Sequence, residues 1–562
     1  MNRKKKILWV GEASFLNTGF SVYGKEVLSR LYQTGKYELA ELGIYGAVFE
    51  PRRLDIPWTY YGNLPMSASE EQAYNSHVTN QWGNWRFEEV LLDFQPDIVF
   101  DIRDWWMFEF VERSPLRPMF HWAIMPTIDS APQREQWLGT YLNADSVCAY
   151  SEFGRDCMIR ETNGKVKFCG IAPPAADYNV WKPAPNKKEL REFMGLESDI
   201  TIVGTVMRNQ KRKLYPELIS AFKGFLEQYP ELGKKTFLYC HTAFPDVGWD
   251  MPRLVRESGI GHKILFTYHC QNCGYVFPSF FQDAQQSCPR CKKLAAKMPT
   301  SDSGIDNKQL SDVVNCFDIY VQYSICEGFG MPQVEAAACG IPVMAVNYSA
   351  MESVVQNLHG IPINVQTLFR ECETHSYRAY PSNQDFIEKL ADFLRKPETE
   401  RMKMSKNTYR LCRQHYDWDK TTRVWENIFD RVQLLPAEAT WKRPPRIMQP
   451  NMNIPQGLTN EQFVRWCVAN IWGEPERLNS YITLRTIRDL NYGHAPSGGE
   501  LHYDEESAVN YNNKFAPFTR EMVVNLMVNL AQHRNHWEQR RVGILPEDKP
   551  PFITQAKREV HK

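Results

Sequence analysis

The sequence predicts an α/β protein built from two parallel-sheet domains. Short apolar strands alternate with amphipathic helices, and two stretches of the chain open in the same way. In the first stretch, residues 7–10 form the predicted strand and residues 21–31 the helix. In the second, residues 200–206 form the strand and residues 216–225 the helix, whose apolar side chains share one face. With 562 residues, the chain is long enough for two large domains and further regions.

Further apolar runs fill in both predicted sheets. Those that predict strands are, in chain order, residues 98–100, 119–123 and 146–149 in the first domain and residues 236–240, 263–267, 319–323 and 342–346 in the second. A helix-rich stretch follows over residues 382–432. Short strands that alternate with helices in this way indicate parallel sheets.

Proline-rich segments mark the expected boundaries. Residues 172–176 and 182–185 are typical of a linker, and a second group of prolines breaks regular structure after residue 434. The predicted units are a first domain over residues 1–180, a second over residues 181–433, a proline-rich linker over residues 434–456 and a helical accessory region over residues 457–562. In the accessory region, Thr459 and Gln462 have the spacing of a capping box, and no catalytic motif is visible.

Composition and charge restrict the classes of function. The chain has 66 basic and 66 acidic residues, so the overall basic charge of a typical nucleic-acid-binding protein is missing. The apolar run at residues 7–10 is shorter than the core of a signal peptide, and no stretch approaches the roughly 18 apolar residues of a membrane span. Ten of the 14 cysteines are scattered singly, which favours a reducing compartment. We therefore expect a soluble cytoplasmic protein.

The segment from Cys326 to Val343 carries the most informative pattern. It follows a predicted strand and opens a helix near Pro332, a residue favoured in the first helical turn. Two glycines before the helix let the backbone approach a ligand closely, and the unpaired amides at the helix start can bind diphosphate oxygens. Glu335 lies in the first turns of this helix, where a carboxylate can accept hydrogen bonds from ribose hydroxyls, and Glu327 precedes the glycines.

This segment resembles the donor motif of retaining GT-B glycosyltransferases of the family 4 type. The matching residues are Glu327, Gly328, Phe329, Gly330, Glu335, Gly340, Pro342 and Val343. The resemblance implies the GT-B fold, in which two Rossmann-like domains face a cleft. It also implies that Gly328, Phe329, Gly330, Met331 and Glu335 bind a nucleotide-sugar and that Glu327 is catalytic. The alternative is an ordinary strand-to-helix turn with two incidental glutamates.

A second match lies after the first strand of the second domain. Arg208 and Lys213 have the five-residue spacing at which the family places a donor-diphosphate clamp. Their charges would offset the negative charge that develops on the leaving diphosphate. Leu214 stands where the family often has glycine, and a solvated run of cations is the alternative interpretation.

The first domain matches the family more loosely. Gly19 lies in a glycine loop that resembles the one facing the donor across the cleft. His121 and Asp129 fall where the family often places a residue beside the transferred sugar, although a histidine next to a tryptophan is also an ordinary core residue. The resemblance covers residues 6–432.

The resemblance also implies the chemistry. The sugar would leave a UDP or GDP donor with retention of configuration, UDP being the commoner, and no catalytic metal is expected. The Asp417-Trp418-Asp419 pattern of metal-dependent transferases is interpreted here as the start of a helix, because it lies far from the donor motif in sequence.

Two Cys-x-x-Cys pairs predict a zinc ribbon over residues 268–298. The pairs are Cys270 with Cys273 and Cys288 with Cys291, each with the glycine or proline of a tight turn. Four thiolates close a tetrahedral site, so we expect a structural zinc inserted into the second domain. A redox pair is the alternative. Cations and aromatic residues are interleaved in this segment, which could suit nucleic-acid binding or could form the ribbon's own core and rim.

The sequence leaves the chemical identity of the acceptor open between two classes. One class is a saccharide, and the other is a macromolecule such as DNA with a hydroxylated base, docked on the ribbon and the helical region. A non-catalytic nucleotide-sugar or nucleic-acid binding protein is the alternative from another class. The oligomeric state, the sugar and the nucleotide base do not follow from the sequence.

Overall fold

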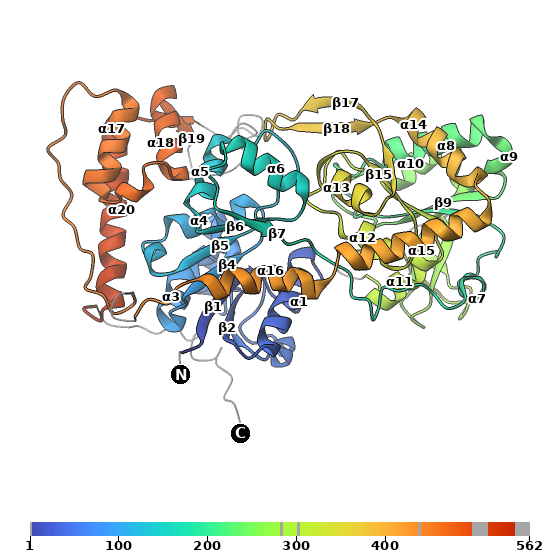
Figure 1. Ribbon diagram of the computed structural model, residues 1–562, viewed down its shortest axis with the longest axis horizontal. Helices are drawn as coiled ribbons and strands as arrows, with labels where there is room; N and C mark the ends of the chain where they lie inside the picture. The colour runs from blue at the N-terminus through green and yellow to red at the C-terminus, as the bar shows by residue number, and fades with distance from the viewer. Residues whose placement is uncertain (1–2, 282–284, 301–303, 437–439, 497–514, 546–562) are drawn as a thin grey trace.

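The chain forms two α/β domains, with a helical region against the outer side of the first (Figure 1). The computed structural model describes residues 3–281, 285–300, 304–436, 440–496 and 515–545. The predicted α/β class with two parallel sheets is confirmed.

The first domain is built on a seven-stranded parallel sheet with the order β3-β2-β1-β4-β5-β6-β7. Its strands are β1 (Lys5–Glu12), β2 (Tyr37–Ile44), β3 (Thr59–Gly62), β4 (Ile98–Asp101), β5 (His121–Ile124), β6 (Ser146–Ala149) and β7 (Phe168–Ile171). Its helices are α1 (Gly19–Gln33), α2 (Ala68–Asn75), α3 (Asn84–Phe94), α4 (Trp105–Arg113), α5 (Glu135–Asn143) and α6 (Glu152–Glu161). Residues 7–10 of β1 are fully buried, as expected for a parallel strand covered on both faces.

The second sheet has a parallel part with the order β10-β9-β8-β14-β15-β16. These strands are β8 (Thr201–Val206), β9 (Thr236–His241), β10 (Ile264–Cys270), β14 (Ile319–Gln322), β15 (Val343–Val346) and β16 (Ile361–Ile363). Three antiparallel strands extend it beyond β10, namely β11 (Val276–Phe280), β12 (Gln285–Ser287) and β13 (Leu294–Lys297). A separate antiparallel hairpin consists of β17 (Val365–Arg370) and β18 (Tyr377–Pro381).

Helices cover the second sheet. They are α7 (Lys187–Phe193), α8 (Tyr215–Gln228), α9 (Pro230–Gly233), α10 (Met251–Ser258), α11 (Asn307–Asn315), α12 (Met331–Ala338), α13 (Ser349–Asn357), α14 (Asn383–Arg395) and α15 (Glu398–His415). The helix-rich stretch expected from residue 382 onward corresponds to α14, α15 and the helix that follows them.

That helix, α16 (Trp418–Arg431), crosses back and packs on the first domain, although its residues fall in the range predicted for the second (Figure 1). Trp425 is fully buried against Phe100 of β4, with ring centroids 4.4 Å apart. Its indole N–H donates to the hydroxyl of Tyr23 at 2.7 Å. The apolar face of α16 thus completes the core of the first domain.

The start of α16 agrees with the interpretation of the Asp-x-Asp pattern. Asp417 is the N-cap residue, and its carboxylate accepts hydrogen bonds from the amides of Asp419 and Lys420 at 2.9 and 3.2 Å. Asp419 is exposed and pairs with Arg30 at 2.7 Å. This pattern therefore begins a helix.

The C-terminal region is helical, as predicted, and packs on the first domain. It comprises α17 (Asn460–Cys467), α18 (Tyr481–Tyr492) and α20 (Arg520–Arg541), with the short strands β19 (His494–Pro496) and β20 (Phe515–Pro517). The capping box of Thr459 and Gln462 is present at the start of α17. Tyr481 packs on Trp105 of α4 with ring centroids 4.6 Å apart. Among the described helices, none is long and apolar enough to cross a bilayer.

The packing of α16 leads to a stability prediction. Trp425→Ala removes a fully buried indole and leaves the Tyr23 hydroxyl without its donor. We expect the free energy of unfolding of the first domain to fall by about 3–5 kcal/mol. Urea unfolding followed by fluorescence measures it, with Tyr492→Ala, at a residue 67 % exposed, as the matched control. Equal small shifts in both variants would show that α16 does not contribute to this core.

Candidate functional site

A cleft of about 750 Å³ lies between the two domains. It is built by loops that follow the carboxyl ends of strands in both sheets, the usual ligand position in open α/β folds. The first domain contributes Asp104, Trp105, Trp106, Thr127, Asp129, Gln133, Trp137 and Tyr141. The second contributes, among others, Gln210, Lys211, Arg212, Trp249, Ile325, Phe369, Glu371, Arg378 and Tyr380.

The predicted donor motif forms the loop between β14 and α12 and the start of that helix. Gly330 is the N-cap residue with φ +83°, a left-handed conformation that favours glycine. A Cβ at this position would lie 2.5 Å from the amide nitrogen of Gln333. No side chain caps the helix, so its first-turn amides keep their capacity to bind an anion.

The two glycine loops meet across the domain interface. A Cβ added to Gly328 would lie 2.2 Å from Cγ2 of Thr127, which belongs to the first domain. A Cβ added to Gly19 would lie 3.8 Å from Sδ of Met331, the first residue of α12. The structure therefore brings the predicted residues Gly19, Gly328 and Met331 together at one end of the interface.

Glu327 is the centre of a buried charge cluster. Its carboxylate pairs with Lys213, and it accepts a hydrogen bond from Arg212 at 2.6 Å. Ser324 and Gln322 donate to it at 2.8 and 2.7 Å. Burial opposes the ionised form, but the charges of Arg212 and Lys213 outweigh it and lower the pKa of Glu327 to about 2. Glu327 is therefore an ionised and fully hydrogen-bonded carboxylate.

The predicted diphosphate clamp is divided in the structure. Lys213 is buried, and burial together with the charge of Arg212 lowers its pKa to about 8. Arg208 points elsewhere, with its side chain 52 % exposed and bound to Asp246 at 3.1 Å. Of the two arginines in this run of cations, it is Arg212, one residue before Lys213, that lines the cleft. The family spacing alone pointed to Arg208, so nothing in the sequence pattern singled out Arg212.

Glu335 lies in α12, and its carboxylate has no hydrogen-bond or ion-pair partner within the described part of the chain. Burial raises the pKa of this carboxyl group to about 7. An unpaired, half-buried carboxylate is costly unless a ligand supplies donors. Its position is compatible with the predicted contact to ribose hydroxyls.

The two candidate residues of the first domain, Asp129 and His121, differ in their position relative to the cleft. Asp129 lines the cleft and pairs with Arg378 of β18 at 2.8 Å, and the thiol of Cys326 approaches it at 3.3 Å. His121 is the first residue of β5, at the edge of the sheet opposite the cleft, and its Nε2 lies 2.8 Å from the hydroxyl of Ser146. The structure does not bring His121 to the cleft, because a strand's amino end faces away from the carboxyl-end loops.

The hairpin of β17 and β18 reaches the first domain (Figure 1). The backbone N–H of Tyr377 donates to the carbonyl of Ala131 at 2.8 Å, and the hydroxyl of Ser376 donates to the carbonyl of Pro132 at 2.7 Å. Arg378 also binds Glu371 at 2.6 Å. The sequence does not predict this wall of the cleft, since its short strands carry no family motif.

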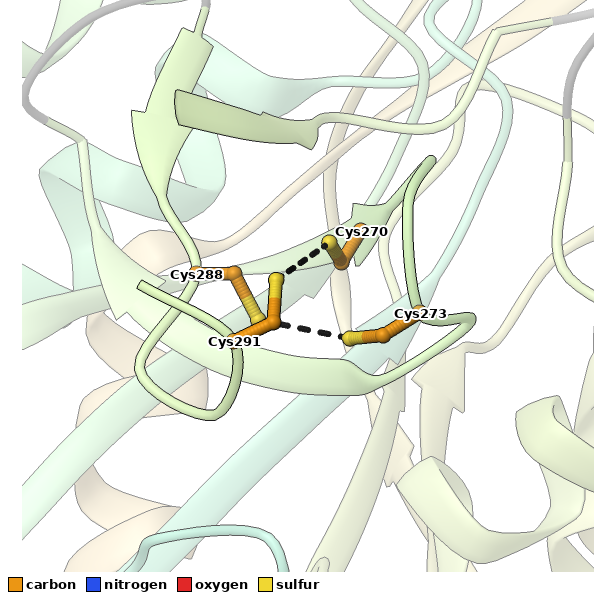
Figure 2. A group of neighbouring side chains, drawn as sticks. All are labelled: Cys270, Cys273, Cys288 and Cys291. Carbon is orange, nitrogen blue, oxygen red and sulfur yellow. Dashed lines mark hydrogen bonds between the residues drawn. The ribbon is translucent and has the colours of Figure 1, made fainter. Parts of the chain in front are cut away.

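The four cysteines of the two Cys-x-x-Cys pairs gather at the strands added to β10, with their sulfurs turned toward one another (Figure 2). All four Sγ atoms lie within 4.8 Å of one another. Cys270 and Cys291 are 3.6 Å apart, and Cys273 and Cys288 are 3.7 Å apart. These distances are too long for disulfides and close to the ~3.8 Å edge of a tetrahedron with metal–sulfur bonds of ~2.3 Å. The cluster could therefore hold a metal ion.

The Cys cluster is not part of the cleft lining. Its segment packs on the loop after β9, where Phe281 lies against Phe244 with ring centroids 6.4 Å apart. The residues that follow Phe244 include Trp249, which lines the cleft. The rings of Tyr275 and Phe277 stack at 5.6 Å, and Arg290 lies over Tyr275 at 5.8 Å. Some of the interleaved aromatic residues and cations thus pack on one another within the insertion.

Comparisons with known proteins agree with this geometry. Residues 303–411 match the family described as "Glycosyl transferases group 1". A D-inositol 3-phosphate glycosyltransferase from Streptomyces bingchenggensis is 24 % identical over 221 residues, which are 38 % of this chain and 41 % of that protein. The chain therefore matches less than half the length of that curated relative.

Solved structures share the two-domain fold. Sucrose-phosphate synthase from Thermosynechococcus elongatus superposes with a TM-score of 0.54 at 16 % identity, over 76 % of this chain and 99 % of its own. Anabaena HepE in complex with UDP and glucose gives 0.52 at 14 % identity, over 76 % and 99 %. WaaG, a glycosyltransferase involved in lipopolysaccharide biosynthesis, gives 0.51 at 12 % identity, over 75 % and 99 %. The chain thus shares the two-domain GT-B fold of these solved structures, and its residues 303–411 match the group 1 glycosyl transferases.

Proposed function

We propose that the protein transfers a sugar from a UDP-sugar to an acceptor hydroxyl with retention of configuration. The observation that carries this proposal is the arrangement at the start of α12. An uncapped helix N-terminus lies beside the cluster of Arg212, Lys213 and Glu327, and the carboxylate of Glu335 lies within the same helix without a partner. The structural neighbour HepE was solved with UDP and glucose, which supports a UDP-sugar as donor.

The donor diphosphate would bind at the first-turn amides of α12. The amides and the helix dipole favour an anion there, and the positive charges of Arg212 and Lys213 would offset the charge on the leaving diphosphate. Glu335 would accept hydrogen bonds from the ribose hydroxyls. The family pattern assigned the arginine role to Arg208, which could join the site only by releasing Asp246.

The state of Glu327 favours a reaction without an enzymic nucleophile. A carboxylate that already accepts bonds from four side chains has little freedom to attack the anomeric carbon. In the proposed step, the bond between the anomeric carbon and the diphosphate oxygen breaks. The acceptor oxygen forms its bond on the same face, and its proton passes to the departing diphosphate. Asp129, which lines the cleft, stays a candidate for contact with the transferred sugar.

A nucleotide screen tests the donor site before the acceptor is known. Bound UDP and UDP-sugars are expected to raise the melting temperature, and slow release of UDP from a UDP-sugar would show turnover. The same screen includes GDP and GDP-sugars, because the base is not fixed by the residues described above. Nucleotide binding with no turnover under any acceptor condition would favour a non-catalytic binding protein.

Glu335→Gln tests the ribose contact. We expect UDP-sugar turnover to fall about 10- to 100-fold, because a charged hydrogen-bond acceptor for the ribose is lost. Without nucleotide, the stability advantage of the variant over the wild type should be larger at pH 8 than at pH 4. The reason is that the wild type loses stability as the pH rises from the ordinary carboxyl pKa of 4.5 to the raised value of about 7, and this loss is complete at pH 8.

Glu227→Gln is the matched control, since this glutamate is exposed on α8. Calorimetry and a UDP-release assay provide both readouts. Unchanged turnover in Glu335→Gln would rule out the assigned contact.

Donor affinity is expected to fall at alkaline pH. Lys213 has a pKa lowered to about 8, so it carries its charge below that pH and loses it as the pH rises further. The dissociation constant for UDP, measured by calorimetry, should increase about tenfold from pH 7 to pH 9. Lys213→Met should bind weakly at both pH values, whereas Lys188→Ala, on the exposed part of α7, should keep the pH dependence. A flat profile in the wild type would exclude Lys213 from the diphosphate site.

We also propose that the four-cysteine cluster holds a structural zinc ion. Four thiolates are typical of closed zinc sites, and no position is left for a substrate. Purified protein is expected to contain one zinc per chain by elemental analysis, and Cys288→Ser should lose it. Cys169→Ser, at an exposed cysteine outside the cluster, is the control.

Chelation is expected to unfold the insertion and to preserve UDP binding, since the cluster lies outside the cleft. Metal-free protein with an intact fold would contradict a structural zinc.

A further inference from the structure

Asp104 is a cleft residue that none of the roles above uses. It is the N-cap residue of α4, yet its side chain does not cap the helix. An aspartate at this position normally accepts a hydrogen bond from a first-turn amide. Here it lines the cleft and makes no ion pair within the residues that the structure describes. The carboxylate lies within reach of Thr127 and keeps further acceptor capacity for a ligand.

The surroundings of Asp104 are aromatic. Trp106 and Trp249 are half-buried and line the cleft, and the indole N–H of Trp249 is fixed by the carbonyl of Lys213 at 2.7 Å. Trp137, also in the lining, is stacked on Trp105 with ring centroids 5.6 Å apart. Aromatic walls with a few polar groups are typical of small-molecule sites. The C–H faces of a sugar ring match such walls, and its hydroxyls match a carboxylate acceptor.

The charges in the cleft disfavour a phosphate-bearing acceptor. Four acidic and three basic side chains line it. Two of the basic ones are occupied, since Arg212 pairs with Glu327, and Arg378 pairs with Asp129 and Glu371. Lys211 makes no ion pair with any described residue, but it lies in the loop proposed for the donor diphosphate. A neutral polyol avoids like-charge repulsion from the carboxylates, whereas a nucleic-acid strand does not.

The hairpin of β17 and β18 closes this part of the cleft. It bridges to residues 131–134 of the first domain, and Phe369 and Tyr380 face the cavity from it. Asp104 and the tryptophans thus share one cavity with the residues of this hairpin.

We propose that this pocket is the acceptor site, that it takes a neutral saccharide, and that Asp104 accepts a hydrogen bond from a second hydroxyl of the acceptor, next to the attacking one. The proposal rests on the proposed glycosyltransferase function. In the reaction, the acceptor oxygen bonds to the anomeric carbon as the bond to the diphosphate oxygen breaks, and its proton passes to the diphosphate. Asp104 positions the acceptor through the neighbouring hydroxyl and takes up no proton. Trp106 and Trp249 hold the ring of the acceptor.

The test measures UDP release from UDP-glucose, UDP-galactose and UDP-N-acetylglucosamine. The acceptors are neutral mono- and disaccharides, the 6-phosphates of the same monosaccharides, and duplex DNA with 5-hydroxymethylcytosine. We expect a neutral saccharide to stimulate release, with kcat/KM at least about tenfold above that of its 6-phosphate. Higher activity with the sugar phosphates or the DNA would overturn the proposal, as would no stimulation by any neutral saccharide in protein that binds UDP.

Asp104→Asn separates the acceptor role from a structural one. It should lower kcat/KM for the acceptor about tenfold or more and preserve the melting-temperature increase caused by UDP. Burial, with the charge of Asp129, raises the pKa of Asp104 to about 7, while Thr127 and Arg212 oppose the shift and Glu12 adds to it. In the wild type, kcat/KM for the acceptor should therefore fall below pH 7, and the variant should lose this dependence. Trp106→Ala should raise the acceptor KM.

Glu71→Gln, at an exposed glutamate of α2, is the matched control and should behave as the wild type. Loss of the UDP effect in Asp104→Asn would assign this residue to the donor site instead. Absence of any melting-temperature change with UDP in the wild type would contradict the proposed function itself and is distinguishable from failure of the acceptor proposal.

Discussion

The buried ion cluster of Glu327 with Arg212 and Lys213 is the interaction on which the site depends. It links the loop after β8 to the loop after β14. Two segments more than 100 residues apart in sequence are thereby held next to each other. Removing one partner would leave an uncompensated buried charge, which is far more costly than losing an exposed pair. The cluster therefore fixes the start of α12 relative to the cations that would face the donor.

A second set of contacts joins the two domains. Asp129 of the first domain pairs with Arg378 of the second, and Gly328 packs so closely on Thr127 that a side chain would not fit. The return of α16 to the first domain adds an apolar connection through Trp425. The proposed donor site thus lies on one domain, whereas the proposed acceptor pocket needs both domains, because the hairpin from the second domain lines it.

The two extra regions take different places in this arrangement. The segment of the cysteine cluster extends the second sheet and packs on the loop after β9, whose later residues line the cleft. Helix α18 of the C-terminal region packs on α5 and, through Tyr481, on α4, and residues of both helices line the proposed acceptor pocket. The accessory region thus contacts the lining of the proposed acceptor pocket where the ring of Tyr481 packs on Trp105.

The sequence by itself determined the α/β class, the donor motif at Glu327 to Glu335 and the spacing of the cysteines. These features are local, because strand burial, glycine turns and short spacings between metal ligands depend on residues that are close together in the sequence. Only the tertiary structure decided that Arg212 and not Arg208 faces the cleft, that His121 lies at the far edge, and that Asp104 turns away from its helix. These side-chain positions depend on loops that follow strands far apart in the sequence. The local sequence pattern does not determine where those loops lie relative to one another.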